Sequence, residues 1–84
     1  MNRMQRINKI LTENFKEFSL EIIDNSHLHT GHNSFDGNNE THLKVILKSK
    51  NLQNINRLEI HKSINELVKN EFVNGLHSLE IKIN

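Results

Sequence analysis

Apolar residues near the start of the chain recur at helical spacing. Met4, Ile7, Leu11 and Phe15 stand three or four positions apart, with polar residues filling most of the positions between them. Because an α-helix has 3.6 residues per turn, these four side chains would share one face. The pattern predicts an amphipathic helix over residues 2–16.

In three later segments, apolar residues occupy every second position, which is the period of a strand with one face on a core. The three apolar sets are Phe18, Leu20 and Ile22, then Leu43, Val45 and Leu47, and finally Leu79, Ile81 and Ile83. Each set predicts a β-strand. His42, Lys44 and Lys48 alternate with the second set, so we expect them to point away from the core, with His42 at the surface or at a partner contact.

The segment between the second and third strands has the pattern of a second main helix. Asn56 followed by Glu59 predicts an N-cap with a glutamate at the third helical position. One apolar stripe follows, made of Ile60, Ile64, Leu67, Val68 and Phe72. Gly75 suits the left-handed position that ends a helix.

Charged residues alternate in sign along this second helix. The cations are Arg57, Lys62 and Lys69, and the anions are Glu59, Glu66 and Glu71. Mixed charges at this spacing are typical of a solvated helix face, so we expect all six to be exposed.

The predicted order is α-β-β-α-β, with a short helical turn near Leu52 before the second main helix. Three strands cannot bury their apolar side chains alone, so we expect two helices packed on one face of a three-stranded sheet and a partly wet opposite face. A chain of 84 residues is expected to form one domain, residues 1–84.

The composition of the chain excludes several classes of function. The chain has no cysteine, which excludes thiol catalysis and thiolate ligands of its own, and its net charge of +1 does not by itself indicate nucleic-acid binding. No apolar run approaches the roughly 20 residues of a membrane span, and no signal peptide is recognisable. No catalytic constellation is present. We expect a small cytoplasmic protein that is not an enzyme.

Histidine is the residue type in this chain that most clearly suggests a chemical function. Three of the six histidines, His27, His29 and His32, fall at the start of a polar segment over residues 25–40. Neutral imidazole is a good metal ligand, and long polar loops are often functional. The spacing alone is compatible with zinc or nickel binding, although no fourth ligand is evident.

Several motifs, in order and spacing, resemble the BolA-like protein family. They are LEIIDNSHLH at 20–29, ETHLKV at 40–45, RLEIHKSIN at 57–65 and EFVNGLHSL at 71–79. The resemblance implies a class II KH-like α/β (α+β) fold and a monothiol glutaredoxin as partner. It also implies a [2Fe-2S] cluster shared with the glutaredoxin and glutathione, and no cofactor held tightly by this chain alone. Such proteins act in iron–sulfur cluster assembly, in cluster trafficking or in iron regulation.

The resemblance assigns roles to individual residues. The family's ligand at the start of the last strand corresponds to His77, and its loop ligand to His29, with His32 as the rival. The helix histidine corresponds to His61, which with Lys62 and Arg57 would face the partner. From the residues alone, the favoured interpretation of His77 is a partly buried ring at the core edge, and that of His61 is a packing residue.

Some BolA-like proteins are described as transcriptional regulators, which gives an alternative function. The phosphate contacts would then be Arg57, Lys62, Lys50 and Lys48. This chain has Ile60 where the family usually has arginine, and it lacks the pair of glycines that clamp nucleotides in RNA-binding KH domains. The resemblance leaves the unbound protein as a monomer or weak homodimer.

Overall fold

The computed structural model describes residues 1–26, 41–50 and 55–84. Its elements are α1 (Arg3–Asn14), β1 (Phe18–Asp24), β2 (His42–Ser49), α2 (Arg57–Leu67), α3 (Lys69–Val73) and β3 (Ser78–Ile83). The predicted order is confirmed, except that the second main helix is divided into α2 and α3. The turn expected near Leu52 lies outside the described residues.

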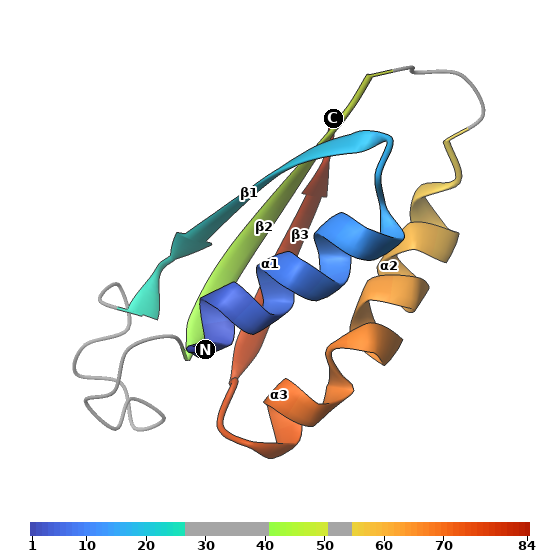
Figure 1. Ribbon diagram of the computed structural model, residues 1–84. Coiled ribbons are helices and arrows are strands. Elements are labelled where there is room, and N and C mark those ends of the chain that lie inside the picture. The colour runs from blue at the N-terminus through green and yellow to red at the C-terminus, as the bar shows by residue number, and fades with distance from the viewer. Residues whose placement is uncertain (27–40, 51–54) are drawn as a thin grey trace.

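The three strands form one mixed sheet in the order β1-β2-β3. β1 runs antiparallel to β2, whereas β3 runs parallel to β2. A parallel neighbour requires a crossover connection, and α2 and α3 lie on that connection. All three helices pack on the same face of the sheet (Figure 1), as the strand alternation predicted.

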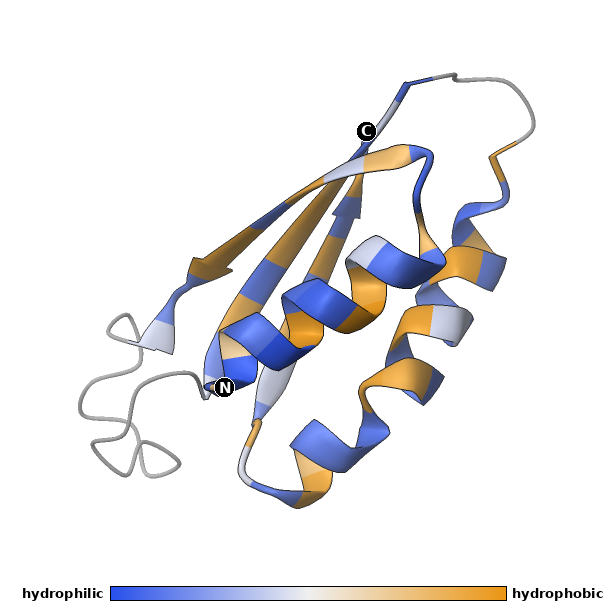
Figure 2. Ribbon diagram, viewed as in Figure 1, coloured by the Kyte–Doolittle hydropathy of each residue, from blue (hydrophilic) through white to orange (hydrophobic). Residues whose placement is uncertain are grey.

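The core lies between the sheet and the helices. Its fully buried side chains are Ile7, Leu11, Leu43, Val45, Leu47, Ile64, Val68, Leu76 and Ile83. The apolar sides of α1 and α2 turn toward the sheet (Figure 2). On the opposite face, Lys44 and Glu80 of neighbouring strands pair at 3.3 Å, which is the charged, wetter face that the alternation predicted.

Local signals in the sequence account for where α1 and α2 begin. The Asn2 side chain accepts a hydrogen bond from the Gln5 backbone N–H, and the Gln5 side chain accepts one from the Asn2 N–H, each at 2.9 Å. Asn56 likewise accepts from the Glu59 N–H at 3.1 Å, as predicted. Both caps satisfy backbone donors that the helix leaves unpaired. α1 ends at Asn14, two residues before the predicted boundary.

The expectation of one continuous apolar stripe through Phe72 is wrong. Val68 leaves the helical conformation, with φ −106° and ψ 12°, and α3 starts after it. Phe72 is 37% exposed, while the neighbouring Glu71 is buried.

Candidate functional site

His77 lies directly before β3, at the end of the turn that leaves α3. Gly75 takes a positive φ of 118° in this turn, as the sequence predicted, and Leu76 is buried in the core. The His77 backbone N–H donates to the Thr41 carbonyl oxygen at 2.8 Å. Its side chain is exposed. The start of β3 thus fixes the His77 backbone and leaves the imidazole accessible.

The ring of His42 packs against the ring of His77. The two rings meet edge to face, with centroids 5.5 Å apart and planes at 88°. His42 is only 7% exposed, and its Nδ1 lies 3.0 Å from the Thr41 hydroxyl oxygen. The expectation that His42 is a surface residue is therefore wrong, and its alternative role as a partner contact stays a prediction. Strand alternation gives the direction of a side chain but not what covers it, and here the neighbouring strand brings a second ring.

Ser26 joins the two chain segments beside this histidine pair. Its Oγ accepts hydrogen bonds from the backbone N–H groups of Thr41 at 2.9 Å and His42 at 3.2 Å. The same hydroxyl donates to Asp24 Oδ1 at 2.6 Å, and Ser26 is 1% exposed. This role of Ser26 was not predicted from the sequence. Its position two residues after an aspartate is typical of an Asx turn and was the available signal.

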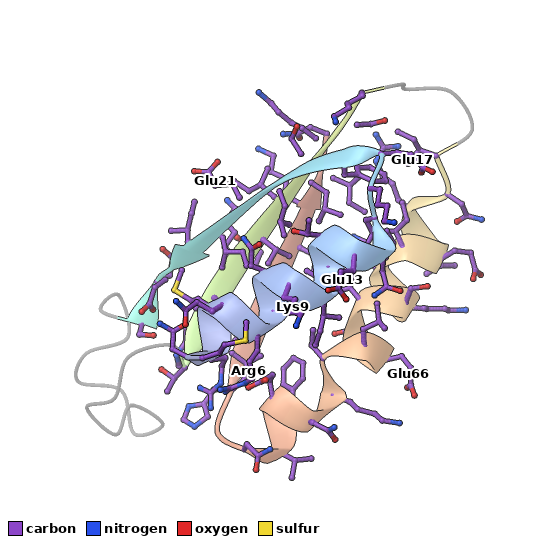
Figure 3. All side chains as sticks on the ribbon, in the orientation of Figure 1. Arg6, Lys9, Glu13, Glu17, Glu21 and Glu66 are labelled. Carbon is purple, nitrogen blue, oxygen red and sulfur yellow. The ribbon has the colours of Figure 1, made fainter. Side chains whose placement is uncertain are left out.

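The buried Glu71 forms an ion-pair cluster with two arginines of α1, of which Arg6 is partly exposed. Arg6 holds its carboxylate with two nitrogens, Nε at 2.7 Å and Nη2 at 2.9 Å, and Arg3 Nε donates at 3.1 Å. Figure 3 shows Arg6 between α1 and α3, while Glu66 points to solvent from α2. The expectation that Glu71 lies on a solvated face is wrong, because Glu71 stands two helical turns after the buried Ile64 and close to its direction around the helix.

The arginines set the charge state of Glu71. Hydrogen bonding from Arg6 lowers the pKa of the Glu71 carboxyl below its usual value. Burial opposes this effect, and Arg3 adds to it. The carboxylate is therefore ionised at neutral pH, and its hydrogen bonds connect α3 to α1.

The other predicted site residues are dispersed. His29 and His32 lie outside the described residues. On α2, Arg57 and Lys62 are exposed and His61 is half-buried. Lys48 and Lys50, near the end of β2, are also exposed. Figure 1 shows α2 starting near the end of β2, whereas α3 lies next to the start of β3.

A shallow groove of about 450 Å³ separates the end of α1 from the middle of α2. Its lining residues are Asn14, Phe15, Lys62, Ser63, Glu66 and Leu67. Lys62, which the resemblance assigns to the partner contact, thus lines a mixed apolar and charged surface.

The chemistry available at the histidine pair is that of an exposed ligand. Within the described part of the chain, no hydrogen bond is made to the ring nitrogens of His77. In residues 1–26, 41–50 and 55–84, no group of three or more His, Asp or Glu side chains could hold a metal ion. A metal ion bound at His77 would need further ligands from outside this part of the chain. None of the described helices is long and apolar enough to cross a membrane.

Comparison with known proteins gives the family. The model of the BolA-like protein family matches residues 1–84. This chain belongs to the BolA-like family. An uncharacterized protein from Sinorhizobium sp is 40% identical over 83 residues, covering 98% of this chain and 89% of the relative. A relative from Haemophilus influenzae named DNA-binding transcriptional regulator BolA is 26% identical over 83 residues, covering 99% and 77%.

The fold matches solved structures of the same family. The BolA domain of SufE1 from Arabidopsis thaliana superimposes with a TM-score of 0.79 at 30% identity, covering 100% of this chain and 92% of that one. The α+β fold expected from the sequence is therefore confirmed.

Proposed function

We propose that this BolA-like protein is an accessory protein that binds a monothiol glutaredoxin and shares a [2Fe-2S] cluster with it through histidine. The main support is His77, an exposed imidazole with no hydrogen bond to its ring nitrogens from the described residues. Contact with the His42 ring and the backbone bond to Thr41 hold it in one place. An accessible but oriented imidazole is what a shared metal site requires.

The second ligand in this proposal is His29, with His32 as the rival. Ser26 is anchored beside His42. Covalent geometry keeps the Cα of His29 within about 11 Å of the Cα of Ser26, whereas that of His32 can lie about 21 Å away. His29 is therefore the more constrained candidate. Because the chain has no cysteine, the thiolates come from the glutaredoxin and glutathione.

Histidine ligands suit a protein that receives and releases a cluster. Replacing thiolates by neutral imidazoles reduces the negative charge of a [2Fe-2S] centre and raises its potential, as in Rieske proteins. The cluster in this proposal is a cargo in assembly, trafficking or iron regulation, and the protein is not an enzyme.

We assign the glutaredoxin contact to α2. Arg57 and Lys62 are exposed there, His61 is half-buried, and Lys62 also lines the groove beside α1. The groove combines the Lys62 cation with the apolar side chains of Phe15 and Leu67, which suits a partner surface that carries a carboxylate beside an apolar side chain.

The test mixes the protein with a cluster-loaded monothiol glutaredoxin and follows visible absorption, circular dichroism and size. The expected result is a heterodimer whose spectrum differs from that of the glutaredoxin alone. His77→Ala should lose the mixed-ligand spectrum. His61→Ala is the matched control, which should weaken the heterodimer but keep the same spectrum at saturation. An unchanged wild-type spectrum with no heterodimer would refute the proposal, and strong binding to apo-glutaredoxin unaffected by His77→Ala would indicate an adaptor instead.

A second candidate function is DNA binding by α2. It is supported by the name of the Haemophilus influenzae relative and by the exposure of Arg57, Lys62, Lys48 and Lys50. Glu59 and Glu66, also exposed on α2, and the net charge of +1 oppose it. Phosphate contacts release counterions, so duplex affinity should fall steeply with salt and be lost in Lys62→Glu. No duplex binding at low salt would remove this candidate.

A further inference from the structure

Arg3 of α1 contacts both Glu71 and the turn that carries His77. We propose that Arg3 and Glu71 are positioning residues for His77, which they orient through the turn between α3 and β3. This inference rests on the proposed ligand role of His77. It gives a function in the site to a cluster of charges that the family resemblance did not mark.

Glu71 provides the fixed end of this arrangement. Its carboxylate is buried and accepts three hydrogen bonds, two from Arg6 and one from Arg3. A two-pronged contact between guanidinium and carboxylate fixes orientation as well as distance. The Arg6 Nη1 also donates to the Met1 carbonyl oxygen at 2.8 Å. The start of α1 and the end of α3 are therefore fixed to each other.

Arg3 extends this contact to the turn. While its Nε donates to Glu71, its Nη2 donates to the Asn74 carbonyl oxygen at 2.7 Å. The Glu71 carbonyl oxygen in turn accepts from the Leu76 N–H at 2.8 Å. A Cβ atom added at Gly75 would stand 3.2 Å from Arg3 Nη2, so the guanidinium lies close against the turn.

His77 is held between this turn and β2. On one side, Arg3 fixes the turn at Asn74, three residues before His77. On the other side, Thr41 accepts the backbone N–H of His77 at 2.8 Å. If the turn moves, the chain between Asn74 and His77 changes its path, and the imidazole of His77 loses its edge-to-face contact with His42. Shifts of about 1 Å at supporting groups are enough to weaken a ligand site.

The test compares Glu71→Gln and Arg3→Lys with the matched control Glu66→Gln. Glu66 is also a glutamate of the α2–α3 segment, paired with Lys69 at 2.7 Å, but it is exposed and makes no contact with the turn. Arg3→Lys retains a positive charge for Glu71. It lacks the planar guanidinium group, which donates to Glu71 and to the Asn74 carbonyl oxygen together. Proton and nitrogen chemical shifts of the imidazoles are read by NMR in the unbound full chain. A domain with several kcal/mol of stability stays almost fully folded after a small loss, so these shifts report local position.

In Glu71→Gln and Arg3→Lys, the ring signals of both His77 and His42 should move toward the values of unstructured histidine. The control Glu66→Gln should leave them in place. The glutaredoxin-bound cluster should be held about tenfold more weakly by Arg3→Lys, a typical loss for a residue that orients a ligand.

If Glu71→Gln does not fold, the ring signals of His77 and His42 in Arg3→Lys alone test the inference. Unchanged ring signals in folded Arg3→Lys would overturn the inference, whatever the cluster does. The two proposals fail separately. Ring signals that respond in a protein that binds no cluster would leave the positioning intact and refute the proposed function.

Discussion

The imidazole rings of His42, the first residue of β2, and His77, directly before β3, meet edge to face with their centroids 5.5 Å apart. The parallel pairing of β2 and β3 sets His42 opposite Ser78, and so places the starts of both strands side by side. The histidine pair is therefore a product of strand register. It links the proposed ligand to a buried residue that the sequence alone assigned to the surface.

If His77 and His29 bind the same iron, replacing either by alanine should abolish the mixed-ligand spectrum formed with cluster-loaded glutaredoxin. The double variant should lose little more, because residues that act as one unit are not additive. Visible circular dichroism of the heterodimer measures the effect. His32→Ala is the control.

Loss of the spectrum in His32→Ala, with retention in His29→Ala, would transfer the role to His32. Retention in both of these variants and in their double variant would mean that neither is the loop ligand.

The stability of the fold should fall in acid because of Glu71. Its pKa is lowered in the folded protein, chiefly by the hydrogen bonds from Arg6. The folded protein therefore binds this proton less readily than the unfolded chain. The stabilisation is fully present above the unfolded pKa, near 4.5, and is lost as pH falls through the folded pKa.

Urea unfolding between pH 7 and pH 3 measures this loss. Glu71→Gln should be less stable at pH 7 by about 1.5–3 kcal/mol, the range for a hydrogen bond to a charged group. Its stability should also depend less on acid than that of the wild type. Equal pH dependence of Glu71→Gln and the wild type would contradict the prediction.

Ser26→Ala should destabilise the junction beside the histidine pair. It removes the acceptor for two buried backbone N–H groups, those of Thr41 and His42. Leaving a buried donor unsatisfied costs about 1–3 kcal/mol. Urea unfolding gives the energy, and amide hydrogen exchange should accelerate at both residues.

Ser19→Ala is the matched control for Ser26→Ala, because Ser19 is exposed on β1. A surface substitution of this kind should stay within about 0.5 kcal/mol. Equal effects of the two changes would show that the hydroxyl of Ser26 does not hold the junction.

The interruption at Val68 predicts which apolar residues of the α2–α3 segment support the core. Ile64 is fully buried, so Ile64→Ala should cost about 2–5 kcal/mol. Val73 is 82% exposed, and Val73→Ala should change stability by no more than about 0.5 kcal/mol. Thermal unfolding of both variants measures the difference. A large loss in Val73→Ala would mean that α3 packs differently.

The sequence by itself determined the elements whose signals are local. Period-two alternation identified the three strands, and the spacing of Ile7 and Leu11 identified α1. The Asn56 cap was equally predictable, because its partner stands three residues away on the same chain segment. Such patterns depend on backbone geometry within one element. The residues alone favoured a partly buried ring for His77, whereas the structure leaves its side chain exposed.

Only the tertiary structure decided which polar residues are buried. Glu71 is a charged residue in a segment of mixed charges, yet it is buried because Arg3 and Arg6 of α1 pair with it. His42 alternates outward on β2, yet it is covered where the start of β3 lies alongside. In each case the deciding partner is distant in sequence, and burial depends on how whole elements pack. A periodicity cannot carry that information, because it describes one element at a time.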